Sequence, residues 1–89
     1  MFVKLKNDGT VNKNRVILTN NNGQWIQLYF SYETIIAFIK QDGEIVCRQN
    51  DWSTTTGKYL NEIQPDKSKR ITGEEFENKV SELLSGLKF

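Results

Sequence analysis

Apolar and polar residues alternate along the first half of the chain, which is the period of a β-strand. The alternation predicts short strands over residues 2–6, 15–19 and 24–32. Residues that favour turns separate these runs, namely Asn7-Asp8-Gly9 and Asn20-Asn21-Asn22-Gly23. The Asn-Gly pair suits the positive φ angles of a tight hairpin. Consecutive strands are therefore expected to pair as antiparallel hairpins.

The third run separates two faces at alternate positions. The expected core face carries Ile26, Leu28, Phe30 and Tyr32, and the second face carries Trp25, Gln27, Tyr29 and Ser31. After a brief corner, further strands are predicted over residues 35–39 and 45–48, with Gln41-Asp42-Gly43-Glu44 as the turn between them. The result is an antiparallel meander that needs a covering layer on its apolar face.

The period becomes helical after residue 50. Tyr59, Leu60 and Ile63 predict a helix near residues 54–63, which Pro65 ends. A second helix begins at Thr72, where a capping box with Glu75 and a hydrophobic staple between Ile71 and Phe76 are expected. Its apolar stripe comprises Phe76, Val80, Leu83, Leu84 and Leu87. We predict one α+β domain over residues 1–89, with a meander of four to five strands covered on one face by two carboxyl-terminal helices.

Composition narrows the possible functions. The 89 residues include 12 Lys and Arg, 11 Asp and Glu, no His and one Cys, for a net charge of +1. A chain this short holds one core. Without His and with a lone Cys47, it lacks the commonest metal ligands, the usual general base and an internal disulfide. Asp51 is expected to form a turn before the first helix rather than to act alone as an acid. We therefore expect no enzyme, no metal and no cofactor.

The sequence also suggests where in the cell the protein is located. Residues 1–6 alternate apolar and basic side chains, unlike a secretory signal, and the apolar run over residues 34–39 is far too short to span a membrane. The single Cys47 fits a reducing compartment, where it is expected to be an inert sheet residue. These features predict a soluble intracellular protein without a membrane partner.

The expected start of the first helix is chemically unusual. It combines an aromatic ring, hydroxyl groups, a glycine and a lysine in Trp52, Ser53, Thr54, Thr55, Thr56, Gly57 and Lys58. The unpaired N–H groups and the dipole of a first helical turn suit a phosphate. Trp52 and Tyr59 stand where a P-loop requires Gly and Ser or Thr, which argues against a nucleotide triphosphatase. Alternatively, the hydroxyls cap the helix and Trp52 packs against the sheet, and both interpretations can hold together.

Two segments carry a resemblance to a known group. Ser31-Tyr32-Glu33-Thr34-Ile35-Ile36-Ala37-Phe38 and Asn50-Asp51-Trp52-Ser53-Thr54-Thr55-Thr56-Gly57-Lys58-Tyr59 fit the patterns Ser-Tyr-x-Thr-(Pro/Val/Ile)-(Val/Ile)-Ala-(Phe/Tyr) and Asn-x-(Trp/Phe)-Ser-x-Thr-Thr-(Gly/Ser)-(Lys/Arg)-His. Over residues 31–63 the chain resembles small, mostly uncharacterised proteins of bacteriophages and archaeal viruses. Ile35 and Tyr59 depart from the frequent Pro and His. The resemblance implies a viral origin, and with it the host cytoplasm, but no particular activity.

Two functions compete. Basic residues near the amino end (Lys4, Lys6, Lys13, Arg15), Lys58, and the loop residues Lys67, Lys69 and Arg70 could meet phosphates while Trp25 and Tyr29 stack on bases. The alternative is a protein-interaction module, such as an inhibitor of a host enzyme or defence factor or a homodimer, that uses a sheet face with Trp25, Tyr29, Ile35 and Ile39. We predict a non-catalytic viral accessory protein that binds nucleic acid or a phosphate-bearing ligand.

Overall fold

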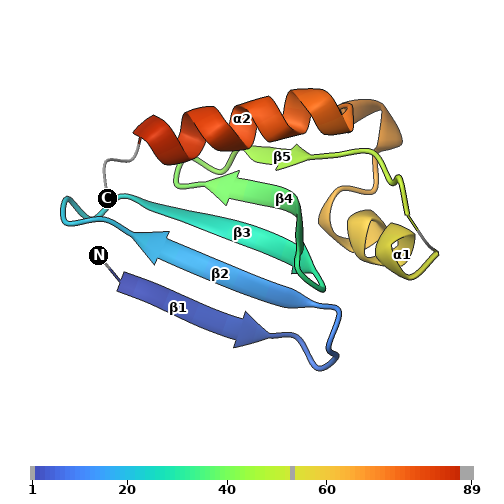
Figure 1. Ribbon diagram of the computed structural model, residues 1–89, viewed down its shortest axis with the longest axis horizontal. Coiled ribbons are helices and arrows are strands. Elements are labelled where there is room, and N and C mark those ends of the chain that lie inside the picture. The colour runs from blue at the N-terminus through green and yellow to red at the C-terminus, as the bar shows by residue number, and fades with distance from the viewer. Residues whose placement is uncertain (1, 53, 87–89) are drawn as a thin grey trace.

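The computed structural model describes residues 2–52 and 54–86, which form an antiparallel five-stranded sheet followed by two helices (Figure 1). The strands lie in chain order across the sheet as β1 (Phe2–Asn7), β2 (Asn14–Thr19), β3 (Trp25–Ser31), β4 (Thr34–Lys40) and β5 (Ile45–Cys47). Helix α1 (Thr54–Ile63), a 3₁₀ turn (Lys67–Lys69) and helix α2 (Gly73–Gly86) follow. The predicted α+β class, the meander and the two carboxyl-terminal helices are confirmed.

The hairpin between β2 and β3 shows why local sequence fixes these turns. Gly23 adopts a φ of 79°, which is readily available only to a residue without a Cβ. The side chain of Asn20 accepts hydrogen bonds from the backbone N–H groups of Asn22 and Gln24, both at 3.0 Å. The turn therefore satisfies its own polar groups, and the predicted hairpin forms.

The pairing of β3 with β4 contains an irregularity that the sequence pattern does not reveal. Tyr29 pairs with Ala37 and Phe30 with Ile35, so that Ile36 is an extra residue on β4. As a result Ile35 packs on the face covered by α2, whereas Ile36 and Ala37 pack on the opposite face. The prediction that Ile35 shares a face with Tyr29 is wrong, because one inserted residue reverses the alternation.

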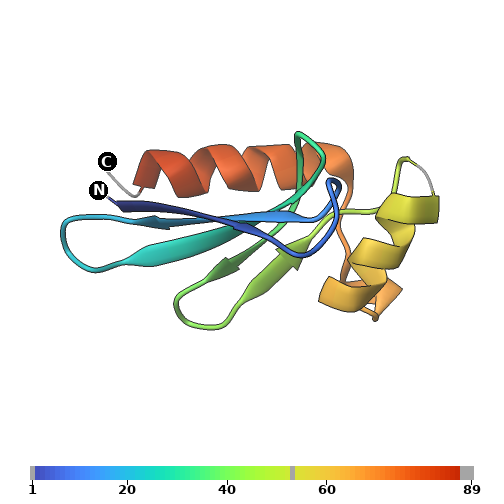
Figure 2. The ribbon, with the colours of Figure 1, turned by 90° about the horizontal axis from the view of Figure 1, so that it is seen from below.

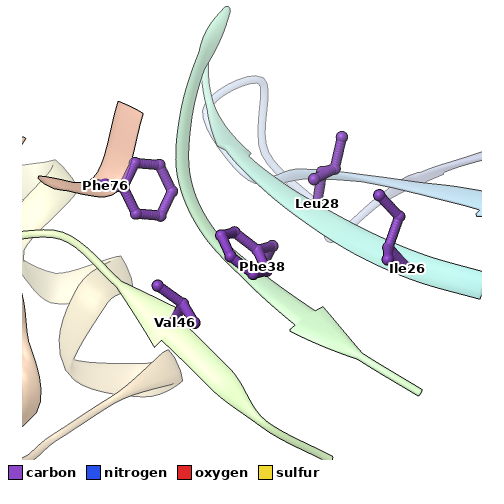
Figure 3. Close-up of a cluster of buried hydrophobic side chains, with 5 residues drawn as sticks. All are labelled: Ile26, Leu28, Phe38, Val46 and Phe76. Carbon is purple, nitrogen blue, oxygen red and sulfur yellow. The ribbon is translucent and has the colours of Figure 1, made fainter. Parts of the chain in front are cut away.

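Helix α2 covers one face of the sheet over β3, β4 and β5. The core there consists of the side chains shown in Figure 3, namely Ile26, Leu28, Phe38, Val46 and Phe76. The rings of Phe38 and Phe76 lie 5.8 Å apart between centroids. At the start of the helix, the Thr72 hydroxyl accepts a hydrogen bond from the Glu75 N–H at 3.2 Å, as the predicted cap requires. The stripe is buried only in part, since Leu84 is 38% exposed, and Leu87 lies outside the described residues.

Helix α1 packs against the other face. Tyr59 and Leu60 contact Ile36, Ala37 and Cys47 to form a second buried cluster. The helices thus divide the two faces between them instead of sharing one, and Figure 2 shows α2 along one side of the sheet and α1 beyond its end. Burial raises the pKa of the Cys47 thiol to about 11, with a smaller opposing effect from the positive charge of Arg70. This thiol is therefore protonated at neutral pH.

The chain after α1 returns to the sheet at Ile71. A parallel bridge joins Ile71 to Arg48, with hydrogen bonds from the Ile71 N–H to the Cys47 carbonyl at 2.9 Å and from the Gln49 N–H to the Ile71 carbonyl at 2.8 Å. The bridge brings the basic loop over residues 66–70 back toward the residues that lead into α1. Two segments far apart in the sequence become neighbours in this way.

Candidate ligand-binding site

A hollow of about 350 Å³ lies where the β3–β4 corner meets the start of α1. We call it the aromatic hollow, and it is lined by Ser31, Tyr32, Thr34, Ile36, Trp52 and Thr56. The first four belong to one of the two motif segments, and the last two belong to the other. In Figure 1 the corner between β3 and β4 faces α1. The hydroxyls of Ser31 and Thr56 form a buried hydrogen bond of 2.9 Å that joins the two segments.

Tyr32 occupies one rim of the aromatic hollow. Its φ is 54°, in the left-handed region that residues with a side chain seldom adopt, and 57% of its surface is exposed. Its N–H donates to the carbonyl of Asn12 at 3.3 Å, which helps to hold the turn. The expectation that Tyr32 lies on the core face is wrong, because β3 ends at Ser31 and the chain turns there. Residues in sparsely populated backbone conformations often lie at ligand sites, so Tyr32 is a candidate ligand contact.

Trp52 occupies another part of the rim and is 46% exposed. The guanidinium of Arg48 lies 4.4 Å from the centroid of its ring, as in a cation–π contact. Arg48 is itself 8% exposed and donates to Asp51 at 3.1 Å and to Glu77 at 3.4 Å. A Cβ on Gly73 would overlap this guanidinium, so the glycine provides the room that Arg48 needs. Trp52 is thus supported by a buried cation and keeps much of its ring exposed.

The residues predicted to bind phosphate at the start of α1 do not act as one group. Thr56 is 4% exposed and bonded to Ser31, so its hydroxyl serves the interior of the protein. Exposed positions are held by Thr54, Thr55 and Lys58, and the predicted Ser53 lies outside the described residues. A Cβ on Gly57 would lie 2.9 Å from the Asn50 side-chain nitrogen, so the glycine makes room for Asn50. Asn50 also accepts a hydrogen bond from the Trp52 N–H at 3.0 Å.

A second hollow, of about 390 Å³, lies on the side of α1 that carries Gly57 and Asn61. We call it the basic hollow, and it is lined by Gln49, Asn50, Gly57, Asn61, Lys67 and Arg70. Arg70 is held in a fixed orientation. Its Nη2 donates to Asn61 Oδ1 at 2.7 Å and to the Gln64 carbonyl at 2.9 Å, and its Nε donates to the same carbonyl at 3.1 Å. Its third nitrogen, Nη1, has no hydrogen-bond partner among the described residues.

The charge of the basic hollow is not neutralised within the described part of the chain. Neither Lys67 nor Arg70 forms an ion pair there, and no carboxylate lines the hollow. Asp66, the acidic residue of this loop, accepts from the Ser68 hydroxyl at 2.6 Å and from the Ser68 N–H at 3.0 Å. These two hydrogen bonds hold the pKa of Asp66 below its ordinary value.

Other hollows with basic residues differ in this respect. Around Tyr59, Lys13 is paired with Glu62 and Arg15 with Asp8, each at 2.8 Å. Elsewhere Lys40 is paired with Glu44 at 2.7 Å. An anion entering either place competes with a carboxylate already present. The basic hollow is therefore better suited to a phosphate than either of these two hollows.

The structure brings together residues that the sequence left in two separate groups. Gly57 from the helix start and Lys67 and Arg70 from the loop line one hollow, whereas Lys69 does not line it. The predicted stacking residues lie elsewhere, because Tyr29 packs edge-on against Tyr59 with 6.3 Å between ring centroids, and Trp25 lines a different hollow. Sequence reasoning missed Tyr32 and Asn50 as candidate ligand contacts, although both belong to the motif segments.

The described residues contain neither a metal-binding cluster nor a membrane-spanning helix. Residues 2–52 and 54–86 contain no cluster of three or more Cys, Asp or Glu side chains that could hold a metal ion. In the same ranges, neither helix combines the length and the apolar character needed to cross a lipid bilayer.

Comparison with known proteins identifies the family of the chain. No curated protein and no solved structure matches it. A family model matches residues 3–78, a range that contains the residues lining both hollows. The chain therefore belongs to DUF8033, a family of unknown function.

Proposed function

We propose that this is a non-catalytic viral accessory protein that binds nucleic acid through its phosphates, with the basic hollow as the main contact. The single observation behind the proposal is the presence of Lys67 and Arg70 in one hollow that is lined by no carboxylate of residues 2–52 and 54–86. Arg70 has a pre-oriented guanidinium, whose Nη1 can donate a charge-assisted hydrogen bond to a phosphate oxygen while Asn61 and Gln64 hold Nη2 and Nε. The amides of Gln49, Asn50 and Asn61 add polar groups at the same place. The viral origin is supported by the motif resemblance over residues 31–63.

The predicted binding is local and moderate in strength. The net charge is only +1, so the protein does not attract polyanions over its whole surface. If Lys67 and Arg70 neutralise two phosphates of a single strand, the slope of log K against log salt concentration is about −1.4. A much steeper slope would indicate contacts spread over many lysines.

Replacement of Lys67 by Gln tests the proposal. Lys67→Gln is expected to weaken binding to a labelled oligothymidylate and to reduce the salt slope by about 0.7, because one phosphate contact is lost. The matched control is Lys69→Gln, which removes the same charge from the same 3₁₀ turn but lies outside the hollow. Fluorescence anisotropy at several salt concentrations measures both variants.

The outcomes separate the possible ligands. Equal losses in the two variants would contradict a defined phosphate site and indicate diffuse attraction. Inorganic phosphate serves as a competitor in the same assay. Displacement of the oligonucleotide at equal phosphate concentration would identify a small phosphate compound, rather than nucleic acid, as the ligand class.

A protein partner is the second candidate function, and a different observation favours it. Strand β1 lies at the edge of the sheet, and its Phe2, Val3 and Leu5 are 77%, 55% and 76% exposed. Exposed apolar side chains on an edge strand are common where chains associate. A homodimer through β1 would appear in light scattering at micromolar concentration and be lost in Leu5→Glu. A monomer at every concentration would exclude self-association and leave only a host enzyme or defence factor as the protein partner.

A further inference from the structure

We infer that the aromatic hollow receives one unstacked base of a single-stranded nucleic acid whose phosphate lies in the basic hollow. This inference rests on the proposed function and adds the strand type and the position of the base. It assigns Tyr32 and Trp52, which are 57% and 46% exposed, as the rings that contact the base.

The lining of the aromatic hollow suits a flat, uncharged group. Its floor includes Ile36, which is fully buried, and its polar groups outside the buried Ser31–Thr56 hydrogen bond are the hydroxyls of Thr34 and Tyr32. None of the described residues that line it carries a charge. A nucleobase presents apolar ring faces and polar edges, which match the exposed rings and the hydroxyls respectively. The volume of about 350 Å³ lies at the small end of ligand sites, which favours one base over a larger group.

The support of Trp52 makes it a firm stacking surface. Arg48 lies against its ring, and the N–H of Trp52 is bonded to Asn50. Arg48 is in turn held by Asp51 and Glu77. A ring that is already held in place loses less conformational entropy when a ligand binds. The charge of Arg48 is balanced by Asp51 and Glu77. Lys67 and Arg70 form no ion pair with a described residue, so their charges can attract a phosphate in the basic hollow.

The two hollows are close enough for one nucleotide to reach both. Trp52 lines the aromatic hollow and Asn50 lines the basic hollow, and these residues are two positions apart. Their Cα atoms therefore lie within about 7 Å of each other. Thr56 and Gly57, which are adjacent in α1, line the two hollows in the same way. A base and its own phosphate are joined through a single sugar, so the pair fits a short separation of this kind.

Duplex nucleic acid does not fit the arrangement. Both faces of a paired base are covered by its neighbours in the stack, so exposed rings such as Tyr32 and Trp52 reach only an unstacked base. Of the lining residues that the structure describes, none has a side-chain amide or a charge that would read one particular base. Preference for single strands with little dependence on base identity follows.

Tryptophan fluorescence of a Trp25→Phe variant tests the inference, because the chain contains two tryptophans and this change leaves only Trp52. Three probes of equal length are titrated: an oligothymidylate, an abasic oligonucleotide and a duplex. We expect the oligothymidylate to quench Trp52 and to bind about tenfold more tightly than either other probe. Equal affinity for the oligothymidylate and the abasic strand, without a change in Trp52 emission, would overturn the inference and leave the proposed function intact. Failure of all three probes to bind would overturn both.

Tyr32→Asn provides the matched variant, since Asn tolerates a φ of 54° and removes the ring without straining the turn. It is expected to lower the preference for the oligothymidylate over the abasic strand from about tenfold to below about threefold, with abasic binding unchanged. Tyr32→Phe keeps the ring and should retain the preference. Loss of abasic binding in Tyr32→Asn at an unchanged melting temperature would contradict the assigned division between the two hollows.

Discussion

Replacement of Phe76 by Ala is expected to lower the free energy of unfolding by about 3–5 kcal/mol. Phe76 is 1% exposed and is the only residue of α2 that is fully enclosed among the described residues. Its ring packs on Phe38 and fills the space between α2 and the sheet (Figure 3). Domains of this size have about 5–15 kcal/mol of stability in total, so the variant would lose a large fraction of it. Urea denaturation followed by circular dichroism measures the change.

The same helix offers a matched control. Leu84 belongs to the predicted apolar stripe but is 38% exposed. Leu84→Ala is expected to change the free energy of unfolding by less than about 1 kcal/mol, because little packing is lost. Losses of similar size at both positions would mean that α2 is buried along its whole length, which contradicts the fold described above.

Replacement of Arg70 by Gln is expected to lower nucleic-acid affinity by about 10- to 100-fold, the largest loss of binding for any single substitution. Hydrogen bonds to charged groups contribute about 1.5–3 kcal/mol, and about 1.4 kcal/mol corresponds to a tenfold change. Arg70 provides both a charge and a fixed orientation, because Asn61 and Gln64 hold its other nitrogens. Anisotropy with a labelled oligothymidylate measures the loss.

Two controls distinguish binding from stability at this position. Arg70→Lys keeps the charge but not the planar group, so an intermediate affinity is expected. Asn61→Ala removes one bond that orients the guanidinium and should cost a smaller part of the affinity. If Arg70→Gln binds as the unchanged protein does, the basic hollow is not the phosphate site. If its melting temperature falls sharply, the Arg70→Lys result decides whether charge contributes separately.

Much of the fold could be predicted because its determinants are local. The helix predicted over residues 54–63 occupies Thr54–Ile63, and Thr72 caps α2 as its spacing with Glu75 indicates. The Asn20 and Gly23 turn forms with bonds among its own residues. Hydrophobic period, capping residues and turn residues act over a few positions, so they can be read from the chain.

The remaining features depend on contacts between distant segments. The extra residue Ile36 in β4 leaves no mark in a pattern of consecutive apolar residues, yet it decides which side Ile35 faces. Ala37 and Phe38 are both buried, although they lie on opposite faces of the sheet. Because both faces of β4 are therefore apolar, the alternation of residue types does not reveal which face each helix covers. The sequence also does not mark where β3 ends, so the alternation over residues 24–32 predicts a core position for Tyr32, whereas the strand ends at Ser31.

The candidate site was predicted in pieces. The sequence singled out Gly57, Lys67 and Arg70 by their chemistry but placed them in two unrelated groups. Their common hollow results from the return of the chain at Ile71 beside β5, which is a tertiary contact. The Thr56 hydroxyl suits an anion by residue type, and only its bond to Ser31 reveals that this hydroxyl faces inward. Residue types indicate an anionic ligand, whereas the geometry narrows the set of residues that we propose to contact it.

The most direct measurement is a ¹H–¹⁵N NMR titration of the whole chain with a short oligothymidylate. The largest shifts are expected for residues that line the two hollows, chiefly Tyr32, Thr34, Asn50, Trp52, Gly57, Asn61 and Arg70. Shifts concentrated instead on β1, or on the Lys13 and Arg15 side of the sheet, would contradict this expectation.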